Sequence, residues 1–173
     1  FINQADFKLA SGNAEDAYGN AFSNMGRDII YIYPDMFICI DDIATSGSEY
    51  TLEYWINTLG DIEFYDNNKG ASITKGKAAM DVRVHYPEKV TPHYIDYFAG
   101  PDLEPVQPSK IAENATDKRL YFQTEKTTGT KIVTTLDVHK SDELSNAVDQ
   151  KNYKDYIRLA FENGTVCYVN TSG

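Results

Sequence analysis

The sequence predicts an all-β protein: an antiparallel β-sandwich, similar to a supersandwich, of about ten to twelve strands with at most short helices. Thirteen tyrosines and eight phenylalanines accompany many threonines, isoleucines and valines, the residue types that fit a pleated, half-buried surface. Short runs of alternating apolar and polar residues recur with turn residues between them. Leucine and alanine runs of helical spacing are scarce, which disfavours bundles and alternating α/β folds.

A single domain is expected, because the chain has 173 residues, and we assign residues 1–173 to it. Hydrophobic residues make up 42% of the chain, enough apolar material for a core without a disulfide framework or a structural metal. The sequence starts at Phe1 rather than at a methionine. We therefore expect it to be a piece of a larger protein.

The first predicted hairpin joins Asp28–Tyr33 to Met36–Ile43 through Pro34-Asp35. Proline sets the backbone angle of the first turn position and aspartate can bond its own backbone, so the connection is expected to be tight. The second strand is almost continuously apolar, which indicates a central strand covered on both faces.

The later strands follow from the same alternation. Tyr50–Thr58 alternates with Leu52 and Tyr54 on one face and Trp55 on the other. The remaining predicted strands are Ile62–Tyr65, Ala71–Thr74, Lys77–Tyr86, Tyr94–Phe98, Leu120–Thr124, Lys131–Val138, Tyr156–Phe161 and Thr165–Val169. The proline-rich segment Pro87–Pro108 predicts a long loop over an adjoining surface, and the polar segment Ser141–Tyr153 predicts a short helix or a loop.

The formal net charge of −10 argues against nucleic acid as a partner, because phosphates are neutralised by clustered lysines and arginines. The same reasoning makes the chain a poor binder of acidic polysaccharides on its own. No stretch approaches the roughly 20 apolar residues of a membrane-spanning helix, so we expect no membrane span.

Cysteine and histidine residues do not form a metal-binding pattern. Cys39 and Cys167 each lie in an apolar run and are expected to be small buried hydrophobes, although a disulfide between them stays open. His85, His93 and His139 lack metal-ligand spacing, and we expect His85 and His139 at the surface. We therefore predict neither a metal nor a cofactor.

No catalytic motif stands out in the sequence, which has neither a nucleophile elbow nor a phosphate-binding glycine loop. Paired carboxylates such as Asp41-Asp42 could serve a glycosidase, but an acidic β-protein offers many such pairs, and turn and solubility chemistry explains them. Trp55 has two interpretations: stacking on a sugar ring, or filling the space between two sheets, which is the commoner use of such a ring.

Two N-terminal segments carry a family resemblance. Ser11–Tyr18 resembles the "gD-x-x-x-aY" stretch of heparinase II/III-like polysaccharide lyases. Arg27–Tyr33 and Pro34–Asp41 resemble the basic residue, the apolar strand and the "pD-y-f-vv-D" stretch that follow in that family. In the next strand Asn57 stands where the family often has a histidine, and later strands are similar in rhythm to the family's closing hairpins.

The resemblance implies that the chain is the C-terminal β-sandwich of such a lyase, which cuts uronic-acid-containing polysaccharides by β-elimination. It implies an α/α-toroid partner domain that carries most catalytic groups, and a periplasmic or extracellular location in a bacterium. No catalytic residue of the family carries over to a matching position here. Our leading hypothesis is an accessory β-sandwich without activity of its own, with Arg27 and Trp55 facing the substrate. A free-standing carbohydrate-binding module that uses exposed aromatic residues is the alternative.

Overall fold

A computed structural model describes residues 2–4, 7–97 and 118–172. They form one eight-stranded antiparallel sheet, in the order β1-β2-β3-β4-β11-β8-β7-β6, and two three-stranded sheets, β5-β10-β9 and β12-β13-β14. The strands of the large sheet are β1 (Ile2–Asn3), β2 (Phe7–Asn13), β3 (Phe22–Ile32), β4 (Met36–Thr45), β6 (Asp61–Tyr65), β7 (Gly70–Lys75), β8 (Ala78–Tyr86) and β11 (Gly129–Lys140). The small sheets contain β5 (Glu53–Thr58), β9 (Val90–Ile95), β10 (Lys118–Thr124), β12 (Val148–Asn152), β13 (Tyr156–Phe161) and β14 (Val166–Asn170). The predicted all-β, sandwich-like fold is confirmed.

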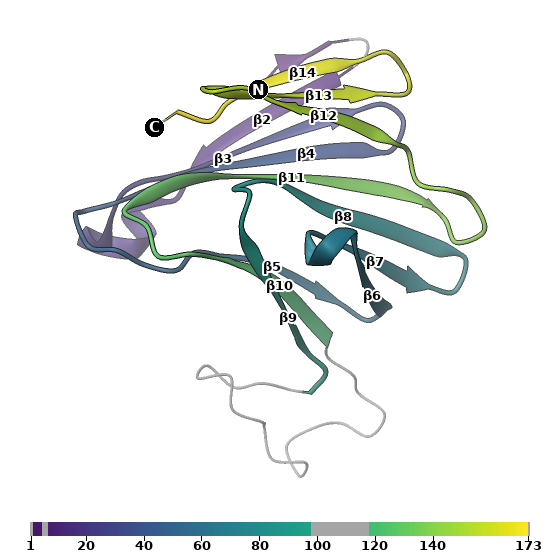
Figure 1. The fold of residues 1–173 in the computed structure, drawn as a ribbon, viewed down its shortest axis with the longest axis horizontal. Coiled ribbons are helices and arrows are strands. Elements are labelled where there is room, and N and C mark those ends of the chain that lie inside the picture. Colours follow the sequence, from purple (N-terminus) through teal and green to yellow (C-terminus); the bar gives the residue numbers. More distant parts are fainter. Residues whose placement is uncertain (1, 5–6, 98–117, 173) are drawn as a thin grey trace.

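The two small sheets cover opposite faces of the large sheet (Figure 1). Strand β4 takes part in both cores because successive side chains of a strand point to opposite faces. Its Cys39 and Ile43 pack toward β5 and β10, whereas its Met36 and Ile38 pack toward β13 and β14. The prediction of a central strand covered on both faces is therefore confirmed.

The first core lies between the large sheet and the β5-β10-β9 sheet. Its buried members are Cys39, Ile43, Leu52, Tyr54, Ala71, Ile73, Val82, Val84, Leu120, Phe122 and Ile132. The second core lies between the large sheet and the β12-β13-β14 sheet, with Ile32, Met36, Ile38, Val133, Ile157, Leu159, Phe161 and Val169 as its buried members. Residues that are adjacent in β11, Ile132 and Val133, enter different cores.

Several elements differ from the prediction. Residues 7–13 form β2, which pairs with β3, and this strand was not predicted. The polar segment 141–153 contains strand β12 rather than a helix, and β12 pairs with β13. The helical elements of the described residues are two 3-10 segments, η1 (Glu15–Ala21) and η2 (Asp66–Asn68). Residues 98–108 of the predicted proline-rich loop lie outside the described residues.

Two histidines are less exposed than predicted: His85 is buried and His139 is partly buried. His85 is 4% exposed and contacts Gln150 and Thr135, because β12 covers the polar face of β8. The side chain of His139 is 10% exposed and lies beside Asp81. The two cysteines are free, and they lie in different cores, on opposite sides of the large sheet. Within the described part of the chain, none of the helical segments is long and apolar enough to span a membrane.

Candidate functional site

Arg27 and Asp41 form a paired charge on neighbouring strands. They are direct cross-strand partners in β3 and β4, so the pleat places both side chains on the face of the first core. The Arg27 guanidinium donates two hydrogen bonds to the Asp41 carboxylate, from Nε and, at 2.9 Å, from Nη2. Asp41 is only 5% exposed, and the hydrogen bonds to it raise the pKa of Arg27 above its ordinary value. The pair is therefore a fixed structural contact.

Tyr54 supports this pair from strand β5. The Arg27 guanidinium carbon lies 5.5 Å from the centroid of the Tyr54 ring, within the range of a cation–π contact. Burial raises the pKa of Tyr54 and that of the neighbouring Cys39 thiol. Both groups therefore stay protonated at neutral pH, and neither is an activated base or nucleophile.

A hollow with a volume of about 250 Å³ opens beside the pair. Its lining residues are Ala14, Tyr18, Met25, Gly26, Arg27, Asp41, Ile43, Glu53 and Ile132. The side chain of Arg27 is 52% exposed, so the guanidinium edge that does not face Asp41 is accessible. Arg27, Asp41 and Glu53 together carry one net negative charge.

Trp55 lies on the outer face of the β5-β10-β9 sheet. Its ring stacks on Tyr121 with centroids 4.1 Å apart, and Tyr121 stacks on His93 with centroids 4.5 Å apart. These residues are direct cross-strand partners, so the rings form a ladder across three strands. Trp55 belongs to neither core, and the interpretation that it fills the space between two sheets is wrong.

Glu53 joins the hollow to the aromatic ladder. Its carboxylate accepts hydrogen bonds from Trp55 Nε1 at 2.8 Å and from Gln123 Nε2 at 2.9 Å, and the residue also lines the hollow beside Arg27. Glu53 thus links the two residues that we predicted to face a substrate, Arg27 and Trp55, and we call these three residues with Tyr121 and His93 the Arg27–Trp55 surface.

Sequence reasoning missed three members of this surface: Glu53, Tyr121 and His93. The alternation in β10 puts Tyr121 on the face opposite Leu120 and Phe122, which was a readable signal. The strand register that places Tyr121 opposite Trp55 and His93 could not be derived from the sequence, because it joins strands that are far apart along the chain. Chemically, the surface offers stacking and hydrogen bonds, and the described residues contain no cluster of three potential metal ligands.

No protein-family model and no curated protein matches this sequence. Solved structures do match the fold. Heparan sulfate lyase HepC from Pedobacter heparinus superposes with a TM-score of 0.72 at 9% sequence identity, covering 98% of this chain and 27% of that one. The heparinase III BT4657 gene product with methylated lysines gives 0.66 at 12% identity, covering 96% and 25% of the two chains. A further heparinase III structure gives 0.64 at 11% identity, covering 98% and 26%.

At this level of identity the likeness establishes the fold. The chain spans about a quarter of the length of HepC and the heparinase III structures that it matches. The resemblance noted in the sequence to heparinase II/III-like lyases is thereby confirmed by independent structural neighbours. This chain has the fold of one β-stranded portion of those heparinases.

Proposed function

We propose that this chain is the accessory β-sandwich portion of a polysaccharide lyase similar to heparinase II/III, and that it braces an α/α-toroid domain. The observation that carries the proposal is the fold likeness, which covers 98% of this chain and 27% of HepC. Such a domain stabilises the catalytic domain and closes one wall of the cleft that holds an acidic, uronic-acid-containing polysaccharide. Because that substrate lies outside the cytoplasm, the protein acts in the bacterial periplasm or the extracellular space.

In this proposal the surface formed by Arg27, Glu53 and Trp55 is the wall that faces the substrate. The Arg27–Asp41 pair and the hydrogen bonds of Glu53 hold these side chains in place. The net negative charge of the hollow suits a wall whose cations come largely from the partner domain. Catalysis by β-elimination then depends on groups supplied by that domain.

Two experiments test the proposal. Sequencing the gene upstream of Phe1 should show an in-frame segment of several hundred residues with helical periodicity. Purified chain incubated with uronic-acid polysaccharides should form no unsaturated product by ultraviolet absorbance. A start codon or a signal peptide directly before Phe1 would overturn the assignment, as would lyase activity of the chain alone.

A free-standing carbohydrate-binding module is the second candidate, and the Trp55–Tyr121–His93 ladder favours it. Stacked aromatic rings on an outer sheet face present apolar surface to the C–H face of a sugar. Trp55 is the only tryptophan, so its fluorescence reports directly on a ligand bound there. Glycan binding that changes this fluorescence and is lost in Trp55→Ala, but kept in Tyr168→Ala on another sheet, would favour the module.

A further inference from the structure

Two hollows lie beside the turn between β8 and β9. One has a volume of about 400 Å³ and is lined by Tyr86, Pro87, Glu88, Lys89, Thr124, Glu125, Lys126, Thr127 and Thr130. The other has a volume of about 200 Å³ and is lined by Lys69, His85, Tyr86, Glu88, Gln150, Asn152, Tyr153, Lys154, Ile157 and Thr171. Tyr86 and Glu88 line both hollows, so the hollows are neighbours, and we call the two together the Tyr86 groove.

The charge of the Tyr86 groove is opposite to that of the chain. Four lysines and two glutamates line it, which gives two net positive charges in a chain with a net charge of −10. Lys89 and Glu125 are 3.6 Å apart and both largely exposed, so their pairing is weak. Lys69 and Lys154 form no ion pair with the described residues, and their ammonium groups are available to a ligand.

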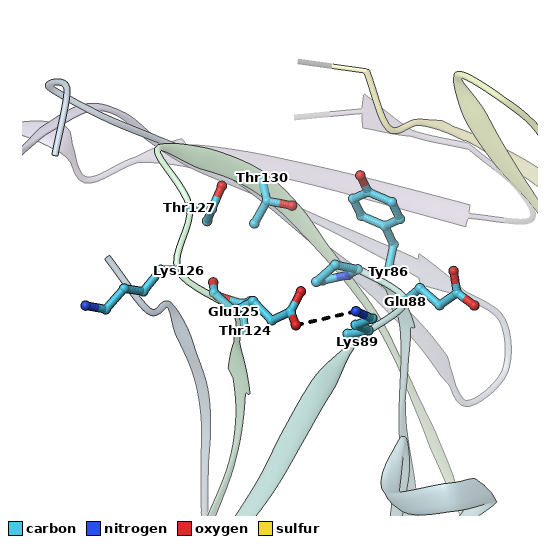
Figure 2. A pocket seen from close by; sticks show the side chains of 9 residues that line it. Tyr86, Glu88, Lys89, Thr124, Glu125, Lys126, Thr127 and Thr130 are labelled. Carbon is cyan, nitrogen blue, oxygen red and sulfur yellow. Dashed lines mark hydrogen bonds and ion pairs between the residues drawn. The ribbon is translucent and has the colours of Figure 1, made fainter. Parts of the chain in front are cut away.

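Hydroxyl and amide groups line the groove between these charges. Figure 2 shows Thr127 and Thr130 on one side of the larger hollow, with the Glu125–Lys89 pair facing them and Lys126 extending outward. In the smaller hollow Gln150 binds both His85 and Asn152, which fixes the amide side chains.

Rigid neutral groups complete the smaller hollow. Burial lowers the pKa of His85 from 6.5 to about 4, so its ring stays uncharged at neutral pH. Tyr153 is 47% exposed and stacks on Tyr156 with centroids 4.5 Å apart. Tyr86 packs against the second core, which holds the centre of the groove in place.

We propose that the Tyr86 groove binds an anionic sugar chain with carboxylate or sulfate groups. Unpaired ammonium groups bind these anions, threonine and amide groups bind ring hydroxyls, and exposed tyrosine rings stack on sugar C–H surface. The site lies apart from the Arg27–Trp55 surface and does not depend on the proposed function. The net charge of the chain predicts poor binding of acidic polysaccharides, but the groove is locally positive. The chain therefore binds such a sugar by itself, weakly and with strong salt dependence.

The test uses the whole 173-residue chain and three probes: an oligogalacturonate, a heparin oligosaccharide and a neutral cello-oligosaccharide. Calorimetry at low ionic strength should show binding of an anionic probe and none of the neutral one, and the two anionic probes distinguish carboxylate from sulfate recognition. Lys69→Gln/Lys154→Gln should weaken binding about tenfold, a loss of about 1.4 kcal/mol. The fluorescence of Trp55 should stay unchanged on binding.

Lys75→Gln/Lys77→Gln is the matched control, since these exposed lysines flank the turn at the opposite end of β8. It removes the same charge and should leave the affinity within about twofold of the wild type. Equal loss in both double variants would reduce the effect to overall charge and overturn the proposal. Equal binding of the neutral probe, or no binding of either anionic probe, would overturn it as well. Unchanged melting temperatures in both variants confirm that folding is not the cause.

Discussion

Replacing Arg27 with methionine tests whether the Arg27–Asp41 pair stabilises the fold. Methionine keeps the apolar stem of the side chain but removes both hydrogen bonds to Asp41, which is 5% exposed. Breaking a fully buried ion pair costs about 3–5 kcal/mol. Because the Arg27 side chain is 52% exposed, water screens part of the charge, and we expect a loss of about 2 kcal/mol.

Urea unfolding at pH 7, followed by circular dichroism and by Trp55 fluorescence, measures this loss. A change of about 2 kcal/mol corresponds to a melting temperature lower by about 4–8 °C in a domain of this size. The double variant Arg27→Met/Asp41→Asn removes the unpaired carboxylate as well and should recover most of the stability. The reasoning is refuted if Arg27→Met unfolds within about 0.5 kcal/mol of the wild type, or if Asp41→Asn adds a further loss to it.

Three other perturbations have defined outcomes. The pKa of His85 is about 4 in the folded chain against an ordinary 6.5, so between these values only the unfolded chain gains a proton on this ring. The free energy of unfolding should therefore drop by about 2 kcal/mol between pH 7.5 and 5. Urea unfolding of His85→Gln should show a smaller drop over the same pH range. In Gly70→Ala the new Cβ would lie 2.4 Å from the Tyr65 ring, so we expect the free energy of unfolding to fall by about 1–3 kcal/mol. Gly12→Ala is the control, because its new Cβ would have no atom within 4 Å. Equal melting temperatures of the two variants would contradict the clash. Burial raises the pKa of both cysteine thiols, so a thiol reagent should modify them slowly in the native chain and quickly in urea, and fast native labelling would show that they are accessible.

Alternation predicted the faces of strands well, because a side chain's face depends only on the parity of its position. Leu52 and Tyr54 are in the first core and Trp55 is on the opposite face, as their spacing indicates. Sheet order was beyond such reasoning. Strand β4 pairs with β11, far along the chain, with Cys39 opposite Thr134, and only the packing of the whole domain decides that partner.

The wrong prediction for His85 has a structural cause. His85 does lie on the face opposite Val82 and Val84, as alternation requires. That face is covered by β12, whose sequence Val-Asp-Gln-Lys-Asn has no strong strand signal. Its Gln150 side chain contacts polar groups of β8 rather than an apolar core. A polar strand over a polar face is stabilised by hydrogen bonds, which a hydrophobic pattern does not reveal.

Overall charge also proved a poor guide to local chemistry. A net charge of −10 describes the field far from the molecule, where individual charges are averaged and screened by salt. A ligand in a hollow responds to the few groups within several ångströms of it. The hollow beside Arg27 has one net negative charge and the Tyr86 groove has two net positive charges, although both lie on the same chain. The two surfaces therefore favour different roles, the first as a wall completed by another domain and the second as a binding site that needs no additional cations.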